Sequence, residues 1–364
     1  MTATPPKTDT AAARWGLLRK LVMAPGVPGR EGPVRDVIQA QCEAISVFDE
    51  IRVDPLGTLI CRRAPRSGPD HSGAQAKRVL VAAHMDQIGF LVSFVEDGGF
   101  LRLHPMGAFD PRTLFARNVR VVNESGQVLP GVIHAEGRAL HHAPEKDRQV
   151  VPELDSFFVD LSLPEDEVRA LVEPGDMVVL AGGFDEVGTS IVAPCLDDRA
   201  GCWALLAAME RLDRHTCEVV AAFTAQEEVG SRGALPLAFA VEADLGIACD
   251  TTVCDALPGN APRHHVTVPG AGVAIQIADA SMISDHRLVG QIETVAKARG
   301  IPFQRSLLMG GGQDGARIHT ARQGVPTVVL SCPIKYIHTA TEMARVEDLH
   351  AFRDLLAAVL ESVR

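Results

Sequence analysis

The sequence predicts an α/β protein whose layered domain is built on a central, mostly parallel twisted sheet, with a small all-β, barrel-like domain inserted into it. Apolar strands alternate with helical patterns in the first and last parts of the chain, which is typical of layered α/β domains. Between Leu91 and Gly188 this rhythm gives way to short alternating strands separated by turn-forming clusters. The length of 364 residues suits two domains, at roughly 150 residues each.

The first part of the chain predicts two helices and then a buried strand. Helical patterns cover about Ala11–Val22 and Gly32–Ile45, with Pro- and Gly-rich residues 25–29 between them. Residues 62–75 are polar and predict a surface loop, which leads into an apolar strand at 78–83. We expect the Thr-, Pro- and Ala-rich residues 1–14 to form a flexible leader, because they lack the apolar core of a secretory signal.

The remaining elements set the expected domain division. After Gly188 the sequence predicts helices at 199–212, 285–299 and 346–363, and strands at 218–224 and 244–249. We therefore expect an α/β domain made of residues 15–90 and 189–364, and an inserted β-rich domain made of residues 91–188.

Composition excludes several classes of partner. Lys and Arg total 35 against 46 Asp and Glu, and the formal net charge of −11 argues against a general nucleic-acid binder. Apolar runs are strand-sized and shorter than the ~18 residues of a membrane span, so we expect no membrane partner. The eight cysteines are scattered without CxxC pairs, which is typical of buried, reduced thiols in a cytoplasmic protein.

Acidic and histidine residues follow five apolar segments. Ligand and catalytic groups of open α/β sheets gather at the carboxyl ends of the strands. Each segment alone has an ordinary explanation: a surface ion pair, a helix N-cap for Asp197 and Asp198, or a turn-forming Asp. The candidate residues are His84, Asp86, Asp197, Glu227, Glu228, Asp250 and His338.

Taken together, five of these side chains suit a pair of divalent metal ions bridged by one carboxylate. The five are His84, Asp197, Glu228, Asp250 and His338. Two such ions can share a hydroxide and polarise a carbonyl, which leaves Glu227 as a free base and Asp86 to orient His84. The five ligands are farther apart in sequence than the ligands of any local zinc motif, so only the fold can bring them together. Such ligands suit Zn²⁺ first, or Co²⁺ or Mn²⁺.

The motifs resemble those of the glutamyl and deblocking aminopeptidases that form tetrahedral particles, family forty-two of the metallopeptidases. They are His84-Met85-Asp86, Leu196-Asp197-Asp198-Arg199, Gln226-Glu227-Glu228-Val229-Gly230, Cys249-Asp250-Thr251 and Tyr336-Ile337-His338. The resemblance runs from about Pro25 to the C-terminus. It implies one metal held by His84, Asp197 and Asp250, and a second held by Asp197, Glu228 and His338. It also implies that Glu227 moves a proton from the metal-bridging water to the leaving amine, with Asp86 orienting His84.

The resemblance further implies that the inserted domain is barrel-like and builds dimers, which assemble into a hollow dodecamer. Two segments depart from the family pattern. Gln313 stands where a Thr is usual, next to Asp314, and Cys195 lies two residues before Asp197. The first departure leaves the substrate preference open, and the second places a thiol, or a buried small hydrophobic side chain, near the metals.

Three functions follow. The first is a cytoplasmic dinuclear-metal aminopeptidase that releases N-terminal residues from short peptides. The second is an amidase or deacylase dedicated to one small acylated or amidated dipeptide, for example an osmoprotectant-related one. The third is a metal-stabilised assembly subunit without catalysis, which has no need for Glu227 beside a ligand.

Overall fold

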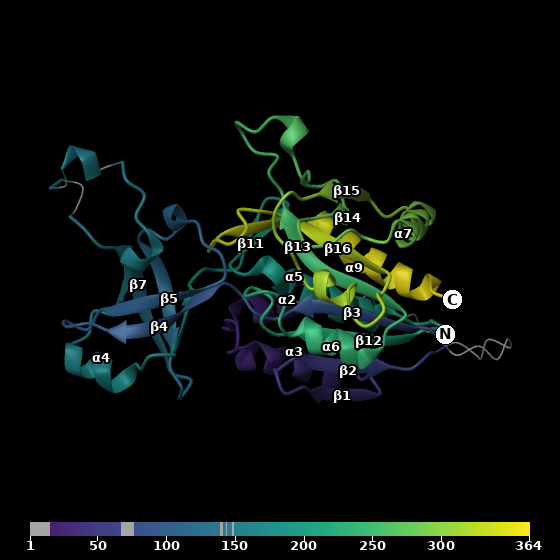
Figure 1. The fold of residues 1–364 in the computed structure, drawn as a ribbon, viewed down its shortest axis with the longest axis horizontal. Helices are drawn as coiled ribbons and strands as arrows, with labels where there is room; N and C mark the ends of the chain where they lie inside the picture. Colours follow the sequence, from purple (N-terminus) through teal and green to yellow (C-terminus); the bar gives the residue numbers. More distant parts are fainter. Residues whose placement is uncertain (1–14, 67–75, 139–140, 143, 148) are drawn as a thin grey trace, which may run out of the picture.

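The computed structural model of the chain describes residues 15–66, 76–138, 141–142, 144–147 and 149–364. Figure 1 shows a broad α/β layer with a small β-barrel at its left-hand side. This arrangement confirms the predicted α/β fold with an inserted barrel. The expected leader at residues 1–14 and most of the polar stretch at 62–75 lie outside the described residues. Of the helices that are described, none is long and apolar enough to cross a membrane.

The α/β layer is built on one large sheet, which has eleven strands in the described chain. The order is β1-β2-β12-β3-β13-β16-β17-β11-β10, and β14 pairs with both β15 and β16. Its strands are β1 (Glu50–Val53), β2 (Leu59–Arg63), β3 (Arg78–His84), β10 (Asp185–Val187), β11 (Ser190–Ala193), β12 (Glu218–Thr224), β13 (Leu245–Val253), β14 (Val273–Ala278), β15 (Phe303–Leu307), β16 (Thr327–Lys335) and β17 (Glu342–Arg345).

The centre of this sheet is parallel, and its flanks are antiparallel except for the parallel pair β14–β15. Strands β12, β3, β13 and β16 pair side by side in parallel register. The pairs β1–β2, β2–β12, β10–β11, β11–β17, β16–β17 and β14–β16 are antiparallel. The expectation of a mostly parallel sheet therefore describes the centre, whereas the sheet as a whole is mixed.

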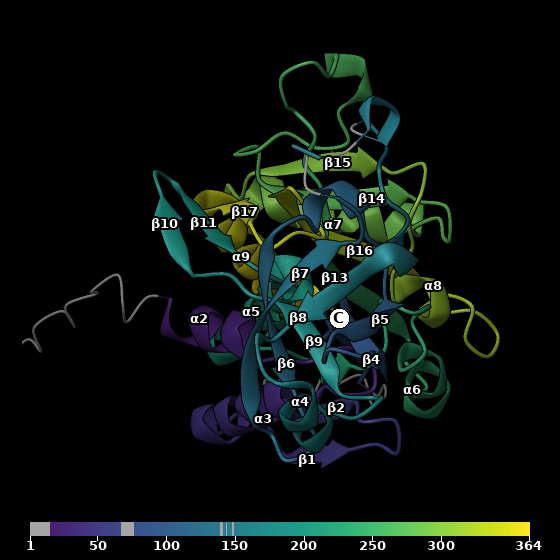
Figure 2. The ribbon, with the colours of Figure 1, turned by 90° about the vertical axis from the view of Figure 1, so that its left-hand side faces the viewer.

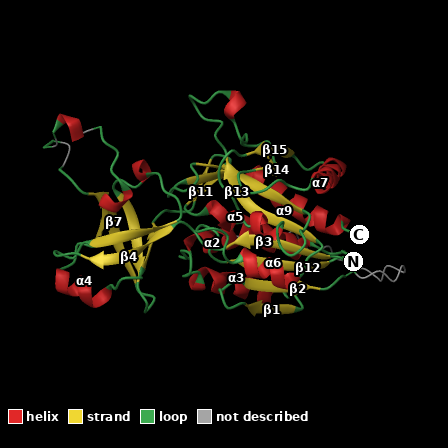
Figure 3. Cartoon of the chain, viewed as in Figure 1, coloured by secondary structure: helices red, strands yellow, loops and turns green. Residues whose placement is uncertain are grey.

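Helices cover both faces of the sheet (Figure 3). Helices α2 (Gly16–Met23), α3 (Gly32–Ile45), α5 (Leu196–Arg211), α7 (His286–Arg299) and α9 (Val346–Ser362) pack on one face. Helices α6 (Ala234–Val241) and α8 (Gly315–Ile318) pack on the other. Side chains alternate along a strand, so Val79 and Val81 of β3 enter the larger core while Leu80 and Ala82 enter the smaller one.

The small body is a closed six-stranded antiparallel barrel in the order β4-β5-β8-β7-β6-β9 (Figure 2). Phe90, Phe157 and Val178 are buried in its interior. Its elements are β4 (Gly89–Val95), β5 (Leu101–Met106), β6 (Arg117–Val122), β7 (Val128–Ala135), β8 (Phe157–Asp160), α4 (Glu165–Leu171) and β9 (Met177–Leu180). Short 3₁₀ turns lie at Pro111–Thr113, Glu145–Asp147 and Leu154–Ser156 here, and at Pro262–His264 in the larger body.

Most predicted elements lie within a few residues of the observed ones. The strand expected at 244–249 continues to Val253, because its pairing with β16 runs from Gly246 to Val253, beyond the Leu245–Ala248 segment that also pairs with β3. The barrel strands begin at Gly89, and β10 belongs to the large sheet because it forms a hairpin with β11. The expected domain limits at 91 and 188 therefore fall inside β4 and just after β10.

Candidate metal centre and active site

Neighbouring parallel strands bring the predicted side chains to one edge of the sheet. His84 ends β3 and pairs in register with Thr224, which ends β12. Asp250 lies on β13, on the other side of β3. The turn after β12 carries Glu227 and Glu228, while His338 follows β16. Parallel strands end on the same side, so chain segments far apart in sequence meet here.

Two groups of side chains in the described chain could each hold a metal ion, and they share Asp197. The first group is His84, Asp197 and Asp250, and the second is Asp197, Glu228 and His338. In the first, His84 Nε2 lies 3.2 Å from Asp197 Oδ1 and 3.9 Å from Asp250 Oδ1. In the second, His338 Nε2 lies 3.3 Å from Asp197 Oδ2 and 3.5 Å from Glu228 Oε2. The two oxygens of Asp197 thus face different histidines.

The donor set fits two divalent cations. Glu228 Oε1 is buried and has no hydrogen-bond partner among the described residues. Burial and neighbouring carboxylates raise the pKa of Glu228 and of Asp250 well above the usual range, although His84 opposes the shift. Buried carboxylates in such surroundings are stabilised by a bound cation, and two imidazoles with three carboxylates are ligands that Zn²⁺, Co²⁺ and Mn²⁺ accept.

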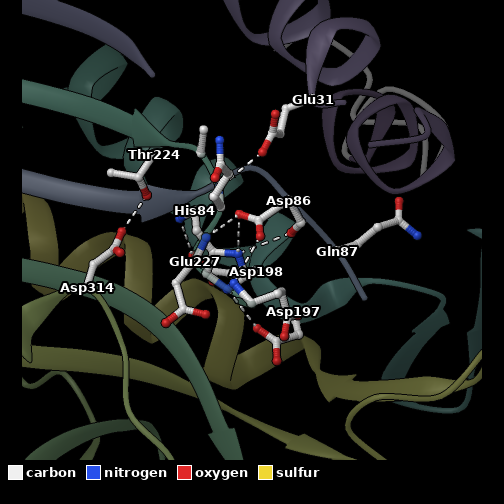
Figure 4. Close-up of polar contacts among 12 residues, drawn as sticks. Glu31, His84, Asp86, Gln87, Asp197, Asp198, Thr224, Glu227 and Asp314 are labelled. Carbon is white, nitrogen blue, oxygen red and sulfur yellow. Dashed lines mark hydrogen bonds and ion pairs between the residues drawn. The ribbon is translucent and has the colours of Figure 1, made fainter. Parts of the chain in front are cut away.

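Glu227 belongs to neither group and lies near His84 of the first (Figure 4). Burial raises the pKa of Glu227 to about 8, opposed by His84 and reinforced by Asp314 and Asp86. The Ser231 hydroxyl donates a hydrogen bond of 2.8 Å to its Oε1. A carboxyl group with a pKa close to neutral can both accept and return a proton, as a general base requires.

Asp86 holds more of the site together than the sequence predicted. Its backbone carbonyl accepts a hydrogen bond of 3.1 Å from His84 Nδ1, and its Oδ1 lies 3.5 Å from the same nitrogen. Its two carboxylate oxygens also accept the backbone N–H groups of Glu227 and Glu228, at 2.9 Å each. One buried carboxylate therefore fixes both a histidine and the acidic turn (Figure 4).

Glu342 is a second such carboxylate, and the sequence analysis missed it. Its Oε2 accepts the backbone N–H of Asp197 at 2.9 Å, and its Oε1 accepts that of His338 at 2.7 Å. Glu342 is 2% exposed, and burial together with Asp197 raises its pKa to about 8. The only signal in the sequence is its position four residues after His338, which is too weak to identify it.

Asp198 and Asp314 are further buried carboxylates around the centre. Asp198 accepts the backbone N–H of Gly201 at 2.9 Å and that of His84 at 3.3 Å, so it connects the start of α5 with the end of β3. Its role thus includes the predicted helix capping. Asp314 is hydrogen-bonded to the Thr224 hydroxyl, and burial raises its pKa to about 6.

Cys195 and Gln313, the two residues that depart from the family pattern, have different surroundings in the structure. The Cys195 thiol donates a hydrogen bond to the Val22 carbonyl at 3.2 Å, and burial raises its pKa to about 12. Burial and a raised pKa are typical of a structural thiol rather than a reactive one. Gln313 is 5% exposed and lines a pocket of about 410 Å³ together with His84, Asp197 and Glu227. This pocket is large enough to admit the end of a peptide.

The family model for the M42 glutamyl aminopeptidases matches residues 69–355. The fold and the site thus define a peptidase, a hydrolase of peptide bonds. The chain belongs to the M42 peptidase family, a family of metal-dependent enzymes, as its motifs indicated.

Three similar proteins support this assignment. The lysyl aminopeptidase of Pyrococcus furiosus is 31% identical over 363 residues, which cover 96% of this chain and 97% of the relative. The aminopeptidase APDkam598 of Desulfurococcus kamchatkensis has a TM-score of 0.89 at 31% identity, covering 97% and 96% of the two chains. The Pyrococcus horikoshii TET1 peptidase, which can assemble into a tetrahedron or a large octahedral shell, has a TM-score of 0.84 at 30% identity, with 95% and 99% covered.

Proposed function

We propose that the protein is a dinuclear-metal aminopeptidase that removes N-terminal residues from short peptides. The observation that carries this proposal is the pair of potential metal groups that share Asp197, with Glu227 beside them in the same pocket. Two divalent cations, Zn²⁺ first and Co²⁺ or Mn²⁺ as alternatives, would polarise a peptide carbonyl and acidify water. His84 and Asp250 would hold one cation, Glu228 and His338 the other, and Asp197 both.

Glu227 is the proposed general base. With Oε1 held by Ser231, its Oε2 is available to take a proton from the attacking water and to return it to the leaving amine. Asp86 is a positioning residue, because it fixes the backbone of Glu227 and Glu228 and lies against His84. Its two hydrogen bonds keep the base and the adjacent metal ligand in one geometry.

We further propose that residues 91–188 act as a dimerisation domain and that dimers assemble into a dodecamer, while 15–90 and 189–364 form the catalytic domain. Large apolar side chains on the outside of the barrel support a contact there, among them Phe94, Val128 and Val132 at 58%, 50% and 42% exposure. Twelve chains of 38.9 kDa would give a particle of about 467 kDa by light scattering. The eight free, buried cysteines support a reducing, cytoplasmic location.

The deciding experiment is hydrolysis of aminoacyl-p-nitroanilides and short peptides by the metal-stripped protein, before and after addition of Zn²⁺, Co²⁺ or Mn²⁺. We expect metal-dependent release of N-terminal residues, and a loss of about 10²–10⁴-fold in kcat for Glu227→Gln. The exposed Glu124→Gln is the control and should keep full activity.

Two outcomes would contradict the proposal. Near-complete activity of Glu227→Gln would refute its role as the base. Binding of about two metal ions per chain without turnover of any aminoacyl substrate, but with turnover of an acylated or amidated dipeptide, would favour the dedicated amidase instead.

A further inference from the structure

The pocket above the metal groups carries a carboxylate that the proposed chemistry does not use. Asp279 follows β14 and lines the same 410 Å³ pocket as His84 and Glu227. Its side chain is half-buried, and it forms no ion pair with any Lys or Arg that the structure describes. A carboxylate facing a substrate pocket without a counter-ion attracts a cation.

Two buried glutamines hold this carboxylate in place. The side-chain amides of Gln276 and Gln313 donate to Asp279 Oδ2 at 2.7 and 2.8 Å. Asp279 Oδ1 accepts the backbone N–H groups of Ser281 and Met282 at 2.6 and 2.8 Å and the Ser281 hydroxyl at 2.7 Å. Neutral donors fix the carboxylate and support its charge without cancelling it.

Gln313 is itself fixed, because its Oε1 accepts the backbone N–H of Gly315 at 2.7 Å. This bond directs the Gln313 amide toward Asp279. The residue that departs from the family pattern therefore acts on the pocket wall, through Asp279.

The rest of the described pocket wall carries no lysine or arginine, and it includes hydroxyl groups that can accept a hydrogen bond from a cation. Thr251 and Thr252 line it at 8% and 2% exposure, and their hydroxyl oxygens have no hydrogen-bond partner in the described chain. No described Lys or Arg lines the pocket, whereas Leu308 and Ile337 supply apolar surface. Apart from the metal groups and Glu227, the wall thus offers apolar surface, hydroxyl groups and one carboxylate, Asp279.

We infer that Asp279, held by Gln276 and Gln313, is a specificity-determining residue that selects substrates with a basic N-terminal side chain, lysine or arginine. The aliphatic stem packs against Leu308 and Ile337, and the cationic head meets Asp279. This inference rests on the proposed aminopeptidase function, since it assigns the side-chain preference of that site.

The test compares lysyl- with norleucyl-p-nitroanilide, because norleucine keeps the lysine stem and lacks the ammonium group. We expect kcat/KM of the metal-loaded wild type to favour lysine at least 10-fold. Asp279→Asn should bring the ratio close to one by lowering lysyl turnover much more than norleucyl turnover, while Asp279→Glu should retain a preference for lysine. Asp285→Asn is the matched control, because Asp285 also accepts two backbone N–H groups but does not line the pocket.

Thermal unfolding verifies that each variant is folded. Calorimetric binding of lysinamide against norleucinamide to the metal-loaded wild type supplies a readout that does not need turnover. Equal turnover of the two substrates, or a lysine preference that survives in folded Asp279→Asn, overturns the inference alone. Absence of hydrolysis with every substrate overturns the proposed function. In that case the binding experiment still tests the inference: equal binding of the two amides overturns the lysine preference, and tighter binding of lysinamide supports it.

Discussion

At the scale of single residues, the centre depends on buried carboxylates that bind backbone rather than metal. Asp86 accepts the N–H groups of Glu227 and Glu228, and Glu342 accepts those of Asp197 and His338. Each one therefore positions two segments or two functional residues at once. Mutation of a residue that hydrogen-bonds to a metal ligand commonly lowers metal affinity by 10–100-fold.

Glu342→Gln tests this at the second carboxylate. An amide of the same shape presents one NH₂ to a backbone N–H that needs an acceptor, so one of the two hydrogen bonds is lost. We expect metal affinity to fall about 10- to 100-fold, measured by calorimetry with Zn²⁺ or Mn²⁺. Glu347→Gln, at a half-exposed glutamate, should leave the affinity unchanged; an equal loss in both variants would contradict the positioning role.

At the scale of elements, one ion-pair cluster connects three strands of the large sheet. Glu218 of β12 is paired with Arg62 of β2 and with Arg78 of β3, the latter at 2.7 Å. Burial raises the pKa of Glu218, but the two guanidinium groups outweigh it and hold the pKa below its usual range. The charged form of Glu218 is therefore stabilised by folding.

The pH dependence of stability follows from that shift. The lowered pKa stabilises the fold above the unfolded-state pKa of about 4.3, and this contribution is lost as the pH falls through the still lower folded-state pKa. Glu218→Gln should cost about 1 kcal/mol at pH 7, and this cost should shrink as the pH falls below about 4.3. Unfolding of both proteins from pH 3 to 8 measures this; a difference independent of pH would show that the lost stability is not electrostatic.

The turn between β12 and α6 carries Glu227 and Glu228. It ends at Gly233, which packs against the start of the turn. A Cβ atom at Gly233 would lie 2.4 Å from the Ala225 carbonyl oxygen and 2.9 Å from Thr58 Oγ1. Both oxygens belong to packed segments, so the turn would have to move.

Gly233→Ala should therefore destabilise the protein by about 1–3 kcal/mol and lower its activity. Gly290→Ala is the opposite control, because a Cβ at that exposed position in α7 meets nothing within 4 Å. It should stabilise the protein by up to about 1 kcal/mol. Denaturant unfolding measures both changes, and a harmless Gly233→Ala would refute the tight closure of the turn.

At the scale of the whole molecule, each metal group joins segments that are far apart in sequence and that the sheet brings close together. Asp197 begins α5, Asp250 lies on β13 and His338 follows β16. A ligand that binds only the folded state adds about 4 kcal/mol when present at ~1,000 times its Kd. Metal binding and global stability are thus coupled.

Metal removal should accordingly lower the thermal midpoint by several degrees, and Zn²⁺, Co²⁺ or Mn²⁺ should restore it. Scanning calorimetry of the chelator-treated and reconstituted full chain measures the shift. Asp250→Asn should shrink the shift, while Asp285→Asn, remote from the metal groups, should not. Identical midpoints with and without metal would contradict a site that binds in the folded state.

The sequence by itself determined the layered α/β domain and the barrel insertion, because apolar periodicity and turn residues are local signals. It also located the strand ends that carry acids and histidines, and the seven candidate residues taken from them stay a prediction of the site. Only the tertiary structure decided that Glu342 supports Asp197 and His338, that the Cys195 thiol contacts Val22, and that Gln313 holds Asp279. These contacts join residues that are distant in sequence or lie on irregular backbone, where no local pattern records the neighbour that the fold supplies.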